Sequence, residues 1–498
     1  MINNPSAFGT SPLRGGFSEG SLERGAVTES DRRGFLSGRR DKAIKSSLDK
    51  STIGFVRLTW PIFVENALRI SLTSVDVFML SFYSVKAVAA VGLINQFAFF
   101  MQLLYLMVAV GASILISQNL GARRQKEAGR IALGSLALGA AFSAILSVVM
   151  CCFANRILGF YKLDPQVHCY AWQFLFIYSA GSVFLAIGMI QSTVLRTHGH
   201  SREPMTVNIL ANIVNVIGNY LFIFGPLGVP KLGVVGVALS TITSQAMACA
   251  ILATRIRAHR DIELPLREIF HVPRKAFRQI LAVGIPTAGE NLSYNIGQMV
   301  VMGIIATLGT SALAATVYAN TVLRFVFITS LSIGNGTQIK VGYWVGAGKP
   351  DDAYAKVFKY FFSGFCISFF LALTLYCFKS PLMAVFTKDP VVLRLVSSIF
   401  LVSLFLEPGR NFNIIIIPAL KGAGDIKFPV YMGMLLMWGI GVMFAYVFGV
   451  VFSWGIIGVW IALACDEWVR GSIMFFRWRG KRWKTKALVT TLHSELTA

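Results

Sequence analysis

Long apolar runs separated by short polar stretches dominate the chain from Ile53 onward. Each run is long enough to cross the hydrocarbon of a bilayer as an α-helix. The pattern therefore predicts an all-α integral membrane protein with twelve transmembrane helices. We expect the spans at residues 53–81, 87–117, 131–155, 166–194, 205–225, 236–254, 280–307, 312–340, 356–378, 392–418, 429–451 and 456–476.

The connections between these runs alternate in charge. Basic residues gather at 123–130, 196–202 and 255–278 and after the last span at 477–486, whereas the other connections carry isolated lysines such as Lys86 and Lys162. Basic connections stay in the cytoplasm by the positive-inside rule. We therefore expect a multi-pass protein of the bacterial inner membrane with both termini cytoplasmic, and twelve spans satisfy that parity.

Composition excludes a soluble globular protein, because 55% of the residues are hydrophobic and only 14% are charged. The net charge of +23 lies mainly in the connections, so we expect no nucleic-acid partner. The seven cysteines show no CxxC spacing and are interpreted as small apolar side chains.

The chain divides at its longest basic connection. Residues 1–52, rich in Gly, Ser and charged residues, are expected to form a disordered cytosolic tail. Six spans follow in an N-lobe at 53–254, then a cytosolic inter-lobe linker at 255–279, and six spans in a C-lobe at 280–476. A basic cytosolic tail at 477–498 completes the chain.

The two lobes repeat each other at an offset of 225 residues. The matched pairs include Pro61 with Pro286, Glu65 with Glu290, Asn66 with Asn291, Asn95 with Asn320, and Gly121 with Gly346. Six spans per repeat is an even number, so both lobes enter the membrane in the same orientation, related by a pseudo-two-fold axis along the membrane normal. Such an architecture suits alternating access around a central site.

The first span carries three charges. Glu65, Arg69 and Asp76 fall on one helical face, and a charge at mid-bilayer costs about 2.5–3.5 kcal/mol or more, so that face must line a cavity or pair internally. Glu65 and Arg69, at i and i+4, can neutralise each other. Asp76 has no such partner one turn away and is the strongest functional candidate.

The seventh span places a second acid in the membrane. Glu290, Tyr294 and Gln298 form one stripe, with Asn291 beside it. We expect two acids flanking the seam between the lobes, where they would attract substrate. The expected cavity residues are Glu65, Glu290, Asn66, Asn291, Tyr294, Gln298, Asn212, Asn95 and Asn320.

An alternative keeps the two acids structural, bonded to Arg69, Arg324 or Arg410. Two further charge groups, Glu407 with Arg410 and Asp466 or Glu467 with Arg470, are interpreted as structural pairs near helix ends. Pro61 and Pro286 each remove a backbone hydrogen bond early in a span and are predicted hinges, although a permanent kink explains them equally well.

Several stretches resemble the MATE family of multidrug and toxic compound extrusion transporters. They are SVDVFMLS around Asp76, NLGARRQKEA at 119–128, its echo WVGAGKPDDA at 344–353, VLRTHGHSREP at 194–204 and EPGRNFNIIIIPALKGAGD at 407–425. The resemblance covers roughly residues 53–476. It implies a secondary antiporter that exports organic, often cationic, small molecules in exchange for protons or sodium ions. We further expect a monomer surrounded by membrane lipids.

The resemblance assigns the candidate coupling site residue by residue. Asp76 matches the first-helix aspartate that the family uses for cation coupling, and Asn215 and Asn219 match positions occupied by Asn and Asp in proton-coupled members. Asn219 cannot titrate. Carboxylate and amide oxygens also suit sodium, with Asp76 as its ligand, so the coupling ion stays open between H+ and Na+. Alternatively, the amides only join helices, worth about 0.6 kcal/mol per contact.

Three rival classes find less support. A flippase for lipid-linked precursors, from the wider superfamily, is expected to have a more cationic cavity, whereas here acids and amides match the arginines. A diphosphate-dependent membrane enzyme needs clustered aspartates, and the chain has none, so we expect no catalysis. His198 and His200 are interpreted as a polar loop and not a metal site. Without an ATP-binding loop or other cofactor motif, ion coupling is the expected energy source.

Overall fold

The computed structural model describes residues 54–228, 230–265 and 273–489. The predicted tail at 1–52 and parts of the inter-lobe linker and C-terminal tail lie outside the described residues. Within these ranges the protein is helical throughout and contains no strand. The all-α prediction is confirmed.

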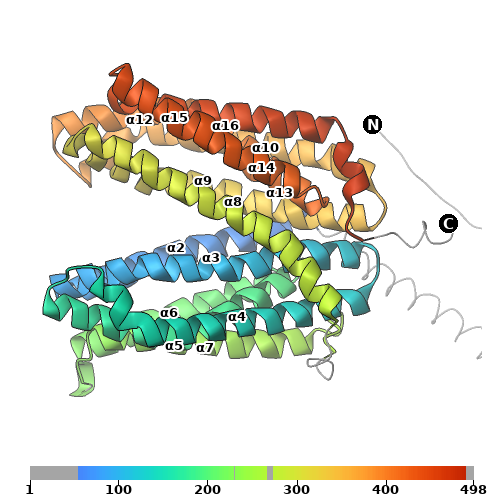
Figure 1. Cartoon of the computed structure of the whole chain (residues 1–498), viewed down its shortest axis with the longest axis horizontal. Helices are drawn as coiled ribbons and strands as arrows, with labels where there is room; N and C mark the ends of the chain where they lie inside the picture. The colour runs from blue at the N-terminus through green and yellow to red at the C-terminus, as the bar shows by residue number, and fades with distance from the viewer. Residues whose placement is uncertain (1–53, 229, 266–272, 490–498) are drawn as a thin grey trace, which may run out of the picture. The chain divides into compact units, whose positions relative to one another are not determined.

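Twelve long helical segments form the two predicted lobes, which Figure 1 shows in blue to green and in yellow to red. The N-lobe consists of α2 (Phe55–Ser81), α3 (Val85–Gly121), α4 (Gln125–Gly159), α5 (Pro165–Thr197), α6 (Arg202–Phe224) and α7 (Val234–Ala258). The C-lobe begins with α8 (Arg274–Thr307), α9 (Thr310–Gly346), α10 (Pro350–Cys377) and the short α11 (Lys379–Ala384). It ends with α12 (Pro390–Asn411), α13 (Ile417–Gly422), α14 (Lys427–Leu436), α15 (Met443–Tyr446) and α16 (Gly455–Arg479).

Nine helical segments of the described chain are long and apolar enough to cross a membrane. The other three long helices are α2, α8 and α16, with 27, 34 and 25 residues. Each is long enough to span. Each also carries acidic side chains turned away from the surface, such as Glu65, Glu290 and Asp466, which lower its mean hydropathy.

Two of the predicted spans are not regular α-helices. A π-helical turn, η4 (Phe412–Ile416), joins α12 to α13, and two more, η5 (Met437–Val442) and η6 (Val447–Val451), interrupt the following span. Hydrophobic periodicity does not reveal such turns, which insert one extra residue per turn. They are common at functional sites, and η4 lines the central pocket described below.

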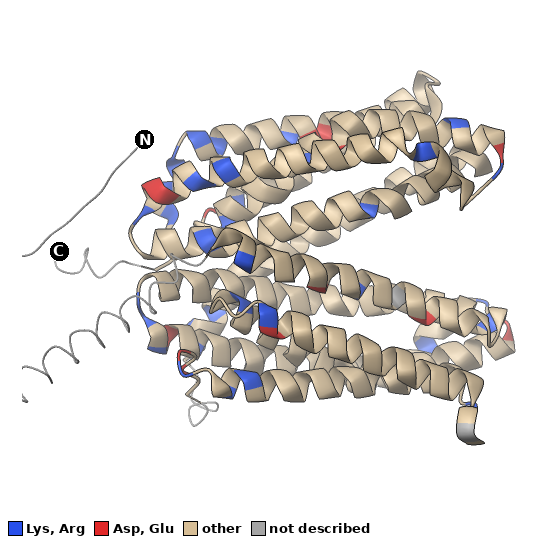
Figure 2. Ribbon diagram, turned by 180° about the vertical axis from the view of Figure 1, so that it is seen from behind, with Lys and Arg blue, Asp and Glu red and all other residues tan. Residues whose placement is uncertain are grey.

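Basic residues mark one end of the bundle, where α3 meets α4, α5 meets α6 and α9 meets α10 (Figure 2). We call this the basic end. The two lobes pack tightly there through glycines. A Cβ on Gly121 would lie 2.2 Å from the carbonyl oxygen of Tyr343, and one on Gly346 would lie 2.0 Å from the carbonyl oxygen of Gln118. Both pairs of partners are 225 residues apart, so the contact maps onto itself under the pseudo-two-fold axis.

The first helix of each lobe begins against the other lobe. A Cβ on Gly111 of α3 would lie 2.5 Å from the carbonyl oxygen of Ile280, and one on Gly336 of α9 would lie 2.2 Å from Cγ2 of Thr59. Beyond Pro286, α8 packs within its own lobe, where Gly297 lies beside Met437. The predicted hinge proline therefore sits where α8 passes from one lobe to the other (Figure 1).

Candidate ion-binding and substrate sites

The structure brings the three predicted coupling residues together. Nδ2 of Asn219 donates to Oδ1 of Asp76 at 2.6 Å and lies 3.1 Å from Oδ1 of Asn215. Asn215 in turn donates to the Thr241 hydroxyl of α7 at 3.2 Å. Both asparagines are fully buried. Sequence reasoning did not single out Thr241, which stands in an otherwise apolar stretch.

Two features suit this cluster to a cation. No basic side chain in the described chain lies within 4 Å of the Asp76 carboxylate, so no ion pair neutralises it. Oδ1 of Asn219 is buried and has no hydrogen-bond partner among the described residues. A carboxylate beside an unpartnered amide oxygen offers the hard oxygen ligands that sodium prefers, and the carboxylate alone accepts a proton.

The asparagine stripe of α6 divides into two functions. Nδ2 of Asn208 donates to the carbonyl of Pro204 at 2.8 Å, and Nδ2 of Asn212 donates to the carbonyl of Asn208 at 2.6 Å. These two amides satisfy their own helix backbone. Only the half of the stripe nearer the C-terminal end of α6 reaches Asp76.

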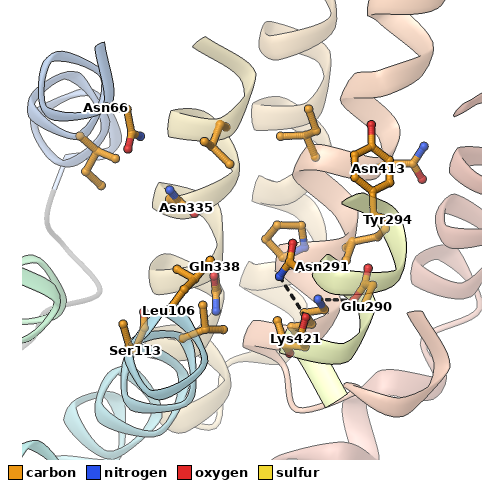
Figure 3. A pocket seen from close by; sticks show the side chains of 18 of the residues that line it. Asn66, Leu106, Ser113, Glu290, Asn291, Tyr294, Asn335, Gln338, Asn413 and Lys421 are labelled. Atoms are coloured by element: carbon orange, nitrogen blue, oxygen red, sulfur yellow. Dashed lines mark hydrogen bonds and ion pairs between the residues drawn. The ribbon is translucent and has the colours of Figure 1, made fainter. Parts of the chain in front are cut away.

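A central pocket of about 390 Å³ lies between the lobes. The N-lobe contributes side chains from α2, α3 and α5, and the C-lobe contributes side chains from α8, α9, the α12–α14 region and α16. Figure 3 shows Asn66 and Leu106 on one side and Asn291, Tyr294, Glu290 and Lys421 on the other. The volume falls in the range that holds drug-sized ligands, about 300–1,000 Å³.

Four predicted cavity residues line this pocket: Asn66, Glu290, Asn291 and Tyr294. Glu65 lies behind it, in contact with the lining residue Arg196. The structure does not bring the other four to the pocket, namely Gln298, Asn212, Asn95 and Asn320.

Their positions along the helices explain this. Asn95 precedes the lining residue Leu106 by 11 residues, about 16 Å along α3. Gln298 follows the point where α8 turns into the core of its own lobe. A repeat match shows that two positions are equivalent, but it does not show that they face the pocket.

Each repeat-matched acid forms a buried ion pair. Oε2 of Glu65 lies 3.1 Å from Nη1 of Arg196, and Oε2 of Glu290 lies 2.6 Å from Nζ of Lys421. The alternative with Arg69, Arg324 or Arg410 as partners is wrong, and Arg69 instead donates to Oδ1 of Asn66 at 3.3 Å. Residues 196 and 421 also differ by 225, so the offset held the signal for these partners.

A third charge cluster joins α12 to α16. Arg410 contacts Glu407 at 2.6 Å and Glu467 at 3.5 Å, and Arg470 contacts Glu467 at 3.0 Å and Asp466 at 2.8 Å. Arg410, Glu467 and Arg470 line the pocket. The interpretation of these groups as pairs near helix ends is wrong for α16, because residues 466–470 lie near the middle of this helix.

The pocket wall has more basic than acidic side chains. Two acids line it, Glu290 and Glu467. The acids Glu65, Glu407 and Asp466 pair with lining arginines but are not themselves part of the wall. Five basic side chains line it: Arg69, Arg196, Arg410, Lys421 and Arg470. The sequence-based expectation of matched acids and arginines holds for the whole cluster and not for its surface.

The MatE family model matches residues 61–221 and 286–447, two segments whose starts are 225 residues apart. The chain belongs to the MATE family. Both matched segments coincide with the two six-helix repeats. The resemblance expected from the sequence is thereby confirmed, together with the twelve-helix, two-lobe architecture of a multi-pass membrane transporter.

Similar proteins extend over nearly the whole chain. The uncharacterized transporter YisQ of Bacillus subtilis is 37% identical over 449 residues, covering 90% of this chain and 98% of its own. A probable multidrug resistance protein NorM of Thermotoga maritima is 27% identical, covering 87% and 94%. These relatives place this MATE protein among bacterial multi-pass membrane transporters.

Solved structures share the fold. A MATE transporter in the bent conformation superposes with a TM-score of 0.79 at 21% identity, covering 88% of this chain and 97% of its own. A MOP-superfamily transporter from Pyrococcus furiosus, whose reversed binding-pocket polarity suggests a different function, gives a TM-score of 0.76 at 21% identity. The alignment covers 86% of this chain and 95% of that one.

Proposed function

We propose that this MATE protein is a secondary antiporter that exports organic small molecules in exchange for a monovalent cation, H+ or Na+. The observation that carries the proposal is the contact of 2.6 Å between Asn219 and Asp76, beside an unpartnered amide oxygen and without a neutralising base in the described chain. A lone carboxylate of this kind within a membrane protein is a functional-site hypothesis by default.

Helix α2 links the ion to the substrate. It carries Asp76 at one point and, seven residues earlier, Arg69 in the wall of the central pocket, about 10 Å along the helix axis. Cation binding at Asp76 would shift α2 against α6 and α7. The same shift would move Asn66 and Arg69 in the pocket, so ion and substrate would bias the same element in opposite directions, as antiport requires.

The side from which the pocket is sealed follows from the basic end. By the positive-inside rule that end faces the cytoplasm. The lobes meet there through Gly121 and Gly346, which allow backbone contact and leave no room for a side chain. The structure therefore corresponds to a state closed to the cytoplasm. Export requires these glycine contacts to separate so that cytoplasmic substrate enters.

The wall of the pocket favours organic anions or zwitterions over the cations expected from the family resemblance. Five basic side chains face two acidic ones, and Arg69 has no carboxylate within 4 Å among the described residues. A carboxylate, sulfonate or phosphate on an amphiphilic ligand would pair with Arg69 or exchange with the acids that hold the other bases. The Pyrococcus furiosus neighbour with a pocket of reversed polarity is a precedent on the same fold.

Membrane potential distinguishes the two substrate classes. If one cation enters while an organic cation leaves, no net charge moves and the potential contributes nothing. If one cation enters while an organic anion leaves, both movements carry positive charge inward. An inside-negative potential then contributes twice about 2.3 kcal/mol for every 100 mV.

The test uses purified protein in liposomes with two xanthene dyes of opposite charge, carboxyfluorescein and rhodamine 6G. We expect gradient-driven transport of carboxyfluorescein, accelerated by a potassium-valinomycin potential. Preferential transport of rhodamine 6G would retain antiport and reject the anionic class. If neither dye moved with an imposed H+ or Na+ gradient while a lipid-linked pyrophosphate crossed the bilayer, the flippase, which the basic wall also suits, would replace the antiporter.

A further inference from the structure

Away from the pocket, four side chains with metal-ligating atoms meet at the basic end of the N-lobe. His200 lies in the turn between α5 and α6, Glu203 in the first turn of α6, and His259 and Asp261 directly after α7. Nε2 of His200 is 3.0 Å from Oδ2 of Asp261, and Nε2 of His259 is 3.6 Å from Oε1 of Glu203. The two imidazole rings stack with centroids 3.8 Å apart and planes 14° apart.

The spacing fits tetrahedral coordination. Zinc binds imidazole nitrogen and carboxylate oxygen at about 2.0–2.1 Å, so neighbouring ligand atoms are about 3.3–3.4 Å apart. The two measured separations, 3.0 and 3.6 Å, lie on either side of that value. One ligand atom each from His200, His259 and Asp261 lies within 4.8 Å of the others, so small side-chain rotations complete the site.

The chemistry of the cluster favours a transition metal over two protons. Two imidazolium rings stacked at this distance would repel each other, whereas a divalent ion binds both rings in their neutral form and is balanced by the two carboxylates. Imidazole ligands select zinc-like ions over Mg²⁺ and Ca²⁺. Arg255, whose Nε lies 3.4 Å from Oε2 of Glu203, is the cation that competes for that carboxylate.

The C-lobe provides an internal comparison. The position equivalent to His200, 225 residues on, is Asp425, which forms an ion pair with Nε of Arg477 at 2.8 Å. After the three-residue slip late in the repeat, Arg255 matches Arg477 and His259 matches Lys481. A permanent ion pair therefore closes this corner in one lobe. The other lobe has imidazoles there, which the fold alone does not require.

From these observations we infer that His200, His259, Asp261 and Glu203 form a binding site for a divalent transition metal ion of the zinc type. The ion would fasten the start of the inter-lobe linker to the turn between α5 and α6. The linker already lies against the N-lobe, since a Cβ on Gly129 of α4 would fall 1.7 Å from the carbonyl oxygen of Glu263. Bound metal would stiffen the connection between the moving lobes, raise the unfolding temperature and slow transport.

The test uses the untagged full-length protein, with Co²⁺ absorption and Zn²⁺ calorimetry as probes. We expect one saturable site per chain. His200→Ala and His259→Ala are expected to lower the affinity about 100-fold or more, since even outer-shell changes cost about 10–100-fold. His168→Ala, on α5 and outside the cluster, should bind like the wild type.

A second variant guards against simple misfolding. The double change His200→Asp with His259→Lys reproduces the C-lobe residues at both positions, and we expect it to unfold at the wild-type temperature in EDTA. It should no longer bind Co²⁺ or gain stability from Zn²⁺. Binding by this variant equal to that of the wild type, or the absence of a saturable site in the wild type, would overturn the inference.

Discussion

Lys421 of α13 lies 2.6 Å from Glu290 of α8, and the repeat carries this pair onto Arg196 and Glu65 of the other lobe. Each pair joins the proline-containing first helix of its lobe to a helix that ends at the basic end. Each also places a basic side chain in the wall of the pocket. The two pairs therefore couple the substrate site to the helices that cross between the lobes.

Loss of one partner of this pair is expected to be costly. Lys421→Met leaves the Glu290 carboxylate buried without its counter-charge, and such losses typically reduce the free energy of unfolding by about 3–5 kcal/mol. The double variant with Glu290→Leu should recover much of that loss, because no buried charge remains. Denaturant unfolding in detergent measures both.

The control for this series is Lys86→Met, which removes a half-exposed pair with Asp164 and should change stability little. If Lys421→Met were as stable as the wild type, or if the double variant were less stable than the single one, the pair would not be the buried contact described here.

The glycine contact at the basic end predicts a conformational shift. Gly121→Ala places a methyl group 2.2 Å from the carbonyl oxygen of Tyr343, so the lobes must separate at that end. We expect a longer distance between spin labels at exposed positions 126 and 349, measured in a cysteine-free background. Gly188→Ala, with no atom within 4 Å of its new methyl group, should leave the distance distribution unchanged.

Pro286 is expected to govern turnover more than binding. Pro286→Ala restores a backbone donor where α8 passes between the lobes, and the stiffer helix should transport several-fold more slowly with a nearly unchanged substrate Kd. Pro204→Ala, in the first turn of α6 where no helical hydrogen bond is missing, is the matched control. Equal turnover in both variants would favour a static kink.

Asn219→Asp should change how transport depends on pH. The new carboxylate would lie where an amide nitrogen now sits 2.6 Å from Asp76, and two carboxylates at that distance must share a proton. We expect transport to follow the pH gradient more steeply and the sodium gradient less. Asn208→Asp, at a position bonded to its own helix backbone, should keep the wild-type profile. An unchanged profile in Asn219→Asp would argue against this cluster as the coupling site.

The sequence predicted much of this because its signals are strong. Apolar runs, charged connections and the offset of 225 specify helices, lobes and pseudosymmetry without any contact information. The Asp76 cluster was also accessible, since family positions identified Asn215 and Asn219. Thr241 carried no signal, because a lone threonine in an apolar helix usually bonds its own backbone, as it also does here to Val237 at 2.9 Å.

Partners across helices were harder to predict. Glu65 and Arg69 share one helical turn, but the carboxylate turns to Arg196 of α5 instead. Arg410 and Arg470 looked like local pairs because each has an acid three or four residues away. Only packing of α16 against α12 shows that these groups form one cluster in the pocket wall. Local spacing identifies which residues can pair, whereas tertiary packing decides which do.

The coupling role of Asp76 is the central claim, and a comparison of active and passive transport tests it most directly. In liposomes, Asp76→Asn should bind substrate with wild-type affinity and exchange labelled for unlabelled substrate, yet fail to accumulate substrate when an H+ or Na+ gradient is imposed. Accumulation by Asp76→Asn at the wild-type rate with either gradient would contradict the claim.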